Sequence, residues 1–469
     1  MTTSSITFPH ELVEAFVEQL APGRGAILEE EIFQTLIACT LTSKYFSFAA
    51  RKRLFSTLVI DRESKYPLQK NTSRSKIRTE EETSRRINSF LGLLDDERSS
   101  DLALMIRRLY IIVDKERFIF QEATNLHGLL RSLSNRAHNL SILRVWGHIW
   151  FSWMTIPQET ADGLQALCRL LPVNRLSFNL VYDIPSTIVS VQKCPRLRYI
   201  DFKKSKFRKL EASMSAGLNI SPANVTSRKL DLLGNLPTNG IYEIRYTSNG
   251  RTHIIGIDST IHLFGDSQRL NQLLRDERIR SSLRYCRCTF SDTHKLLSTT
   301  KAIDFGTMVL LRQLVIELHI GLSQRYEVSR DIITSKMRMD LYERYEDITD
   351  AMNSLIDYLY YGNAQSALRK IKVTLNVERV LCKGTGMFDI VDFSSLQRLR
   401  IDFLRKKHPL IQSTQFHMNI GLMWHNSGPL AGESSVEKIV RKLVTNAITL
   451  PSNDKSLLPK IHICAKREH

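Results

Sequence analysis

Leu140-Ser141-Ile142-Leu143-Arg144-Val145 carries apolar residues at its first, fourth and sixth positions, and the same spacing returns along most of the chain. The first apolar residue packs where the chain turns into a strand, and the other two point inward along a strand of period two. One such stretch cannot bury its apolar row alone, so successive stretches have to stack. The other stretches with this spacing begin at Ile106, Val173, Leu197, Leu311, Leu368 and Leu396.

Helix-like sequence lies between most of these stretches, which predicts an α/β fold of parallel strands joined by helices. The pattern resembles leucine-rich repeats in an irregular form, because the repeats begin from about 24 to more than 50 residues apart and the regular Asn ladder is missing. The resemblance implies a solenoid with helices on its convex side. One insertion is expected near 240–258, where residues 241–246 and 252–257 flank Asn249-Gly250 and predict a β-hairpin.

The first sixty residues have helical rather than strand periodicity. Pro9 suits the first turn of a helix, because its missing N–H would have no partner there. A second apolar stripe follows the break at 21–25, and a third ends before Leu54-Phe55, so we predict three short helices. The apolar positions of the stripes are Leu12, Phe16 and Leu20; Ile32, Phe33, Leu36, Ile37 and Leu41; and Tyr45, Phe46, Ala49 and Ala50.

This N-terminal block resembles an F-box of the kind common in large families of fungal proteins. The motifs that carry the resemblance are Phe8-Pro9-His10-Glu11-Leu12, Ala38-Cys39-Thr40-Leu41 and Arg51-Lys52-Arg53-Leu54-Phe55. The resemblance implies that the block binds Skp1, the adaptor of a cullin-RING ubiquitin ligase, and reaches the cullin through it. The contacts it implies are Pro9, Leu12, Phe16, Leu36, Ile37, Leu41 and Phe46. The alternative for the same residues is a helical cap on a larger core.

Composition indicates a soluble globular protein, with 42% hydrophobic and 24% charged residues. No apolar run approaches the roughly 20 residues that span a bilayer. The first residues also lack the pattern of a secretion signal, so we expect the cytoplasm or the nucleus and no membrane partner. In those compartments the seven cysteines are expected to be reduced.

The net charge of +18 has three explanations: a generally basic surface, an acidic protein partner, or nucleic-acid binding. The basic residues are spread along the chain, with short clusters such as 203–209, and no regular series of aromatic residues lies between them. A stacking platform for nucleic acid needs such aromatic residues. A basic surface is therefore favoured, and nucleic acid is the least favoured partner.

The sequence contains no Walker loop, nucleophile elbow, dinucleotide-binding fingerprint or zinc-protease motif, so we expect neither enzyme activity nor a cofactor. Cys286-Arg287-Cys288 with His294 is the nearest approach to a metal site. It lacks a fourth ligand and the usual two-residue gap between cysteines. We therefore predict buried strand cysteines there and no metal site.

Trp146, Trp150 and Trp153 lie close together with His148. Such a cluster favours a sealed core at the turn after a strand, and a protein-contact site is the alternative.

We predict an N-terminal domain over 1–60, a polar linker over 61–82 and the repeat domain over 83–469. A helix is expected to contain Ile87, Phe90, Leu91 and Leu94. A helix over 436–443 and a strand over 461–463 would form a C-terminal cap.

The function that these patterns favour is the substrate-recognition subunit of an SCF-type ubiquitin ligase. Skp1 would bind the N-terminal helices, and a protein substrate of unknown identity would bind the solvent-facing strand residues. By alternation, these residues are Tyr110, Arg144, Tyr199, Asp201, Lys372, Arg400 and Asp402. The alternatives are a repeat scaffold outside any ligase and a basic nucleic-acid-binding protein.

Overall fold

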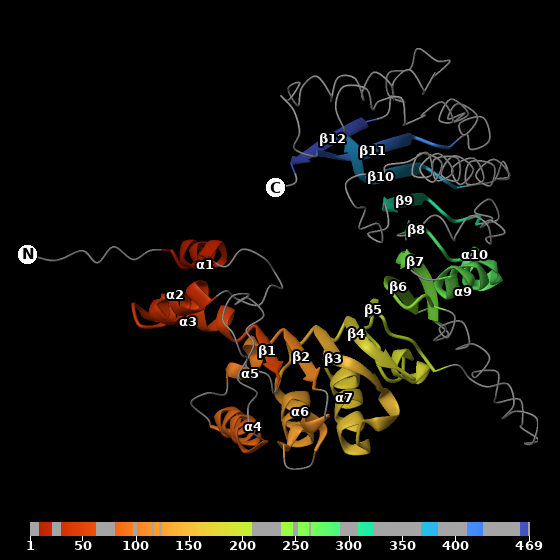
Figure 1. Cartoon of the computed structure of the whole chain (residues 1–469). Helices are drawn as coiled ribbons and strands as arrows, with labels where there is room; N and C mark the ends of the chain where they lie inside the picture. The colour runs from red at the N-terminus through yellow and green to blue at the C-terminus, as the bar shows by residue number, and fades with distance from the viewer. Residues whose placement is uncertain are drawn as a thin grey trace, which may run out of the picture. The chain divides into compact units, whose positions relative to one another are not determined.

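The computed structural model of the chain describes residues 9–20, 30–61, 80–96, 101–114, 117–121, 124–208, 236–246, 252–261, 264–290, 308–321, 367–382, 410–424 and 460–467. The chain divides into two compact units: unit 1 holds residues 1–234 and 246–252, and unit 2 holds residues 235–245 and 253–469. Each unit combines β-strands with helices (Figure 1), so the predicted α/β class is confirmed. The domain limits at residues 60 and 82 stay predictions.

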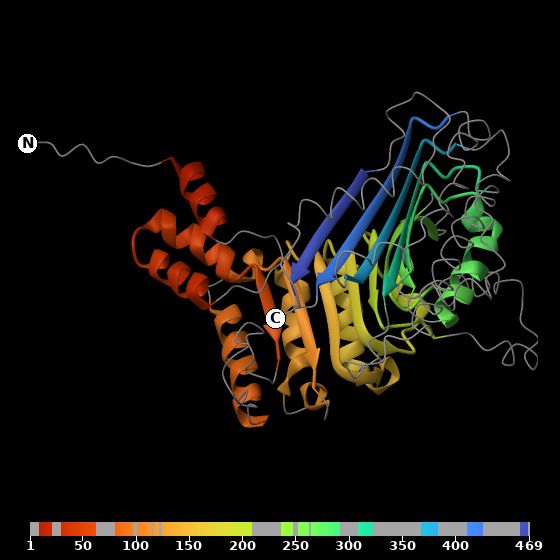
Figure 2. The same cartoon turned by 45° about the horizontal axis from the view of Figure 1, so that its top comes forward.

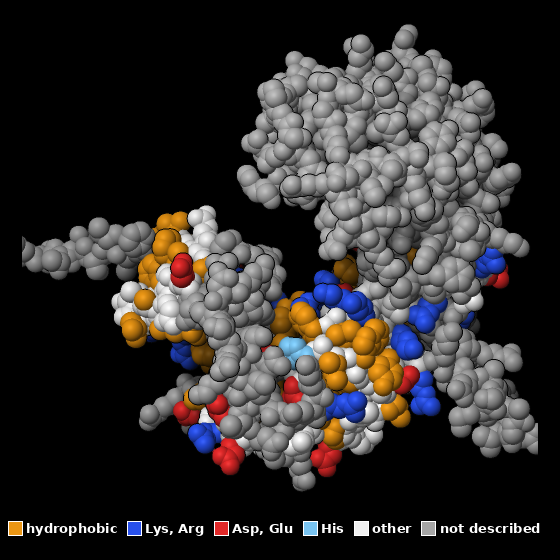
Figure 3. Space-filling model, in the orientation of Figure 1, with side chains coloured by type: hydrophobic (Ala, Val, Ile, Leu, Met, Phe, Trp, Pro, Cys, Tyr) orange, Lys and Arg blue, Asp and Glu red, His pale blue; other side chains and the backbone are white. Residues whose placement is uncertain are grey.

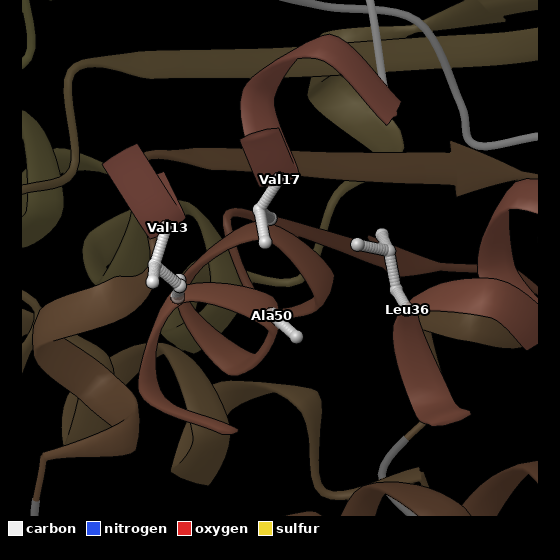
Figure 4. Packing of buried hydrophobic residues seen from close by; sticks show 5 residues of the cluster. Val13, Val17, Leu36 and Ala50 are labelled. Atoms are coloured by element: carbon white, nitrogen blue, oxygen red, sulfur yellow. The ribbon is translucent and has the colours of Figure 1, made fainter. Parts of the chain in front are cut away.

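Unit 1 opens with three helices: α1 (His10–Leu20), α2 (Glu30–Thr40) and α3 (Lys44–Leu54). The Ser43 side chain caps α3 by accepting a hydrogen bond from the Phe46 amide at 3.3 Å. Figure 4 shows the small core between the helices, which consists of Val13, Val17, Leu36, Ala49 and Ala50. Two of these five residues are alanines, and Ile32, Cys39, Phe46 and Leu54 pack against the cluster while only partly buried, so the core is small.

A parallel sheet follows, and its strands pair in sequence order: β1 (Thr57–Ile60), β2 (Arg108–Val113), β3 (Ile142–Ser152), β4 (Arg175–Tyr182) and β5 (Tyr199–Lys203). The helices that accompany them are α4 (Glu80–Asp95), α5 (Leu102–Met105), α6 (Leu126–Arg136) and α7 (Gln158–Leu170), with 3₁₀ turns η2 (Phe118–Phe120), η4 (Trp153–Thr155) and η5 (Ser186–Val189). Helices α4, α6 and α7 lie in a row on one side of the strands (Figure 1). The helix predicted around Ile87 is confirmed as α4.

The recurring apolar spacing marks buried strand positions, as predicted. In unit 1 the residues at the three apolar positions are at most 2% exposed in every stretch: Ile106, Leu109 and Ile111; Leu140, Leu143 and Val145; Val173, Leu176 and Phe178; Leu197, Ile200 and Phe202. In unit 2 Leu311, Leu314 and Ile316 are equally buried, as are Leu368 and Ile371 of the next stretch, but its third residue, Val373, is only partly buried. The side chains between them lie on the opposite face of the strands.

Several neighbouring parallel strands are joined by the same backbone arrangement at the start of the strand. The Arg107 carbonyl accepts hydrogen bonds from the amides of Ser141 and Ile142, at 2.9 and 3.2 Å. In unit 2 the Arg312 carbonyl accepts from the amides of Arg369 and Lys370, at 2.9 and 3.0 Å. Because one carbonyl holds two successive amides, the register between neighbouring strands is fixed from the first residue.

Unit 2 begins with β6 (Gly240–Tyr246) and β7 (Thr252–Ile261), which form the predicted hairpin. A Cβ on Gly240 would lie 2.8 Å from the Asp258 oxygen, and a Cβ on Gly256 would lie 3.1 Å from the Glu243 Cβ. Contacts that run in opposite directions along the two strands show an antiparallel pair. Asn249-Gly250 itself lies outside the described residues.

The rest of unit 2 is parallel. The helices are α9 (Phe264–Arg275) and α10 (Glu277–Arg280), and the strands are β8 (Tyr285–Phe290), β9 (Gln313–Gly321), β10 (Lys370–Cys382), β11 (Ser413–Trp424) and β12 (Lys460–Arg467). Strands β7 to β12 pair side by side in sequence order (Figure 2).

Strand β12 confirms the strand predicted over 461–463. The stretch that begins at Leu396 and the helix predicted over 436–443 lie outside the described residues.

Candidate protein-interaction surfaces

The three N-terminal helices expose an apolar surface. Of the seven predicted Skp1 contacts, Leu12, Phe16, Ile37 and Leu41 are exposed large hydrophobic residues, and Leu41 reaches 84% exposure. Exposed side chains on several helices form an apolar area that the small core below does not use. Figure 3 shows apolar side chains gathered over these helices, at the left of the view. Tyr45 and Phe48 are exposed as well, although the F-box resemblance does not imply them as contacts.

Leu36 does not lie on this surface. It is fully buried among Val13, Val17, Ala49 and Ala50, because α2 turns its Leu36 side inward and its Ile37 side outward. The prediction that Leu36 itself contacts a partner is therefore corrected: it supports the surface from below.

Phe46 and Pro9 sit at the border of the N-terminal surface. Phe46 is partly buried against the core, and its ring packs edge-on against Phe16 at a centroid distance of 5.9 Å. Pro9 is exposed directly before α1, where its carbonyl accepts hydrogen bonds from the amides of Leu12 and Val13. Phe46 thus positions the exposed Phe16, and Pro9 fixes the start of the helix that carries Leu12.

An ion pair joins the first and third helices. Lys52 Nζ donates to Glu14 Oε1 at 2.8 Å. This hydrogen bond lowers the pKa of Glu14 below its ordinary value, so Glu14 is ionised at neutral pH. The pair is partly exposed and contributes little energy, but it is a direct polar contact between α1 and α3.

A second candidate surface is the strand face of unit 1, where Tyr110, Arg144, Ser177 and Asp201 lie opposite one another on β2 to β5. The Arg144 guanidinium lies 4.6 Å from the centre of the Tyr110 ring, and its Nε donates to Ser177 Oγ at 3.2 Å. Ser177 Oγ in turn donates to Asp201 Oδ2 at 3.3 Å. Tyr110, Arg144, Ser177 and Asp201 thus form one continuous row of interacting side chains across the sheet.

Two predicted strand-face residues, Tyr110 and Asp201, differ from the expectation that their side chains are free to contact a partner. Tyr110 is only 5% exposed, because the Arg144 guanidinium covers its ring; the prediction that Tyr110 faces solvent is corrected. Asp201 already accepts a hydrogen bond from Arg175 Nη2 at 2.9 Å. Tyr199 is exposed at the start of β5, as predicted.

The next register row on the strand face of unit 1 contains an aromatic residue and a cation close to each other. Trp146, Asn179 and Lys203 lie opposite one another, and Lys203 Nζ is 5.8 Å from the centre of the Trp146 ring. Arg144 lies 6.0 Å from the same ring. Two cations over one indole hold it in place through its electron-rich face.

The tryptophan cluster is divided between the core and the surface. Trp153 is buried and packs edge-on against Phe178 at 5.9 Å, which is the core interpretation. Trp150 is 48% exposed, and Ile149 and Met154 beside it in sequence are also exposed. The sequence could not show which tryptophan would face which way.

A backbone irregularity causes this split. The register between β3 and β4 breaks between Trp146 and Phe151, so residues 148–150 leave the regular pairing. A Cβ on Gly147 would lie 2.4 Å from the Ile149 carbonyl oxygen and 2.8 Å from Phe151 Cδ1. Only glycine therefore allows the chain to fold back here.

We expect Gly147→Ala to lower the free energy of unfolding by about 1–3 kcal/mol, since backbone has to shift to admit the methyl group. Gly92→Ala is the matched control: nothing lies within 4 Å of its added Cβ, and it sits inside helix α4. It is expected to stabilise by about 0.5–1 kcal/mol through helix propensity. Urea denaturation of the two variants measures both; equal effects of the two changes would contradict the role given to Gly147.

The strand face of unit 2 carries its own polar network. Arg287 on β8 lies 2.9 Å from the Glu317 carboxylate on β9 and 3.6 Å from Asp258 on β7. The hydrogen bond to Glu317 raises the pKa of Arg287, while burial raises the pKa of Asp258 in spite of Arg287. The predicted residue Lys372 lies in the same register row as Arg287, on β10. Arg400 and Asp402 lie outside the described residues.

A row of two side-chain amides and one imidazole continues this face in unit 2. Asn419 Nδ2 donates to Asn376 Oδ1 at 2.6 Å, and Asn376 Nδ2 lies 3.0 Å from His319 Nε2. These residues are opposite one another on β9, β10 and β11. This row was not predicted, and the alternation of Gln415, His417 and Asn419 with apolar residues over 415–420 is the signal that could have found it.

Cys286 and Cys288 are buried strand residues, as predicted. Their sulfur atoms lie 3.6 Å apart inside unit 2, and the hydrogen bond between them raises the pKa of Cys286 well above its ordinary value. His294 lies outside the described residues, and within the described ones no three His, Cys, Asp or Glu side chains gather as metal ligands would.

Comparison with known proteins does not identify a function for these surfaces. No family model matches the chain, and no curated protein matches it significantly. Among the described residues, no helix combines the length and the apolar character needed to cross a membrane.

Proposed function

We propose that this chain is the substrate-recognition subunit of an SCF-type ubiquitin ligase and docks on Skp1 through α1 to α3. The observation that carries the proposal is the exposed apolar surface of Leu12, Phe16, Ile37 and Leu41 over a core of only five buried residues. A monomer rarely leaves such an area in water, and partner contact would remove it. The F-box-like motifs supply the identity of the partner.

We further propose that the stacked strands and helices of both units are irregular leucine-rich repeats. The buried apolar positions and the parallel pairing in sequence order support this. The strand faces would then hold the substrate. The chain would perform no bond chemistry: it would raise the effective concentration of substrate lysines near the charged E2 enzyme.

Titration calorimetry of the full chain with purified Skp1 tests the proposal. We expect saturable one-to-one binding with a negative heat-capacity change, because apolar surface is buried. No detectable heat and no co-elution in gel filtration, with a folded chain shown by circular dichroism, would leave the helices as a cap. The rival function, a repeat scaffold outside any ligase, would then be favoured by the polar row from Tyr110 to Asp201.

A further inference from the structure

Three chain segments lie side by side at the carboxyl end of β3 to β5. Phe151 and Ser152 of β3 pair with Val181 and Tyr182 of β4, and the segment after β5 continues beside β4. There Ile184 N donates to Lys206 O at 3.3 Å, and Arg208 N donates to Ile184 O at 2.9 Å. Residues 151–154, 181–184 and 204–208 therefore lie side by side.

The segment after β5 is held firmly. Ser205 is fully buried, and its Oγ accepts a hydrogen bond from Val181 N at 3.1 Å. Phe207 is buried against Phe202, with ring centroids 5.0 Å apart. Because Ser205 and Phe207 point inward, the side chains between and after them, Lys206 and Arg208, point outward and are exposed.

An exposed apolar residue just after β3, Met154, adjoins this basic segment. Arg208 Nη1 lies 3.8 Å from Met154 Sδ, which joins the two sequence regions directly. Met154 is 63% exposed, and Ile149 and Trp150 precede it. Figure 3 shows basic and apolar side chains side by side in the area of β3, β4 and α7. We call Ile149, Trp150, Met154, Lys206 and Arg208 the aromatic–basic patch.

The charge around the patch is strongly unbalanced. Residues 142–155, 175–183 and 199–208 contain six Lys or Arg residues and two carboxylates, Asp183 and Asp201. Asp201 is held by Arg175, and Asp183 accepts a hydrogen bond from Ser152 Oγ at 3.0 Å. Neither carboxylate contacts Lys206 or Arg208. A partner that carries carboxylates would complement this surface.

We infer that the aromatic–basic patch binds an extended acidic segment of a partner protein, with an apolar side chain of that segment seated on Trp150 and Met154. The mixture of aromatic, aliphatic and basic residues favours protein over nucleic acid, since Ile149 and Met154 offer no flat stacking surface for bases. The inference rests on the proposed function for its biological setting, because the acidic segment would belong to the recruited substrate.

Selection from a displayed library of random twelve-residue peptides, with the full chain as target, tests this directly. We expect the enriched peptides to be rich in Asp and Glu and to contain Phe, Trp, Leu or Ile. The most enriched peptide is then measured by fluorescence anisotropy. Trp150→Ser/Arg208→Glu is expected to weaken its binding by about 10-fold or more, as removal of an anchor residue and a charge does.

The matched control is Arg169→Glu/Leu170→Ser, which makes equivalent changes at exposed positions at the end of α7. It is expected to change binding by less than about 2-fold. Lys206→Glu alters charge alone at an exposed site and is expected to weaken binding by about 3-fold. Enriched peptides without acidic residues, no enrichment at all, or equal loss in the patch and control variants would overturn the inference. Tighter binding of a 20-nucleotide single strand of DNA than of every selected peptide would overturn it too.

Titration of the same preparations with Skp1 separates the two proposals. Peptide binding that depends on the patch in a chain that does not bind Skp1 would remove the ligase assignment and leave the patch as an interaction surface. Skp1 binding without a patch-dependent peptide would remove the patch inference alone.

Discussion

Leu12→Asp/Leu41→Asp is expected to weaken binding to Skp1 by at least about 100-fold, since two interface anchors are replaced by charges that the complex would bury. Both side chains are exposed in the free protein and take no part in the core of Val13, Val17 and Leu36. The variant should therefore keep the helical circular-dichroism signal of the wild type. Titration calorimetry under the conditions used for the wild type measures the loss.

Leu104→Asp/Leu170→Asp provides the control for this result. Leu104 lies on α5 and Leu170 on α7, and both are exposed leucines, so the chemical change is the same at positions outside the docking helices. The control is expected to bind Skp1 as the wild type does. If it loses as much affinity as Leu12→Asp/Leu41→Asp, or if neither variant loses any, the apolar surface of α1 to α3 is not the docking site.

The buried positions of these strands could be predicted from the sequence, because burial along a strand follows a local rule. Leu143 and Val145, or Leu176 and Phe178, point to the same side since side chains alternate along a strand, and the preceding Leu140 or Val173 marks the turn. The Asn-Gly turn was equally local, and the hairpin of β6 and β7 followed from it.

The same rule missed strands where the inward positions are not aliphatic. Leu283, Cys286 and Cys288 have the spacing of the other stretches and are fully buried. The two cysteines were predicted as buried strand residues, but the stretch was not recognised as one of the series. Strand β11 also went unpredicted, because apolar residues alternate with polar ones only over 415–420. A search for strict alternation, with cysteine counted as apolar, would have found both.

The candidate surfaces were predictable only as sets of positions. Alternation places Tyr110 and Arg144 on the strand face, but that Arg144 covers Tyr110 depends on side-chain contacts between neighbouring strands. In the same way, helical spacing gave Leu36 and Ile37 as neighbours without showing which one faces the core. The exposure of Trp150 follows from the close contact at Gly147, which is a three-dimensional constraint.

Phe178→Ala is the core substitution with the largest expected effect on stability. Phe178 is 2% exposed and lies between Trp153, at a centroid distance of 5.9 Å, and Phe202, at 6.0 Å. Truncation leaves a cavity that these rigid rings cannot fill, so we expect a loss of about 3–5 kcal/mol in the free energy of unfolding of unit 1. Because Phe202 also packs against Phe207, which anchors the basic segment, peptide binding at the aromatic–basic patch should weaken as well.

Hydrogen exchange of the β3 to β5 amides, combined with urea denaturation, reports this change for unit 1 separately from unit 2, which a single global melting temperature does not. Tyr199→Ala is the matched control, an aromatic truncation at an exposed position of the neighbouring strand β5, and it is expected to change stability by no more than about 0.5 kcal/mol. Equal effects at Phe178 and Tyr199 would mean that the aromatic layer behind β3, β4 and β5 does not stabilise unit 1. A large effect at Phe178 alone would show that a residue buried by the recurring apolar spacing stabilises the strands that carry the aromatic–basic patch.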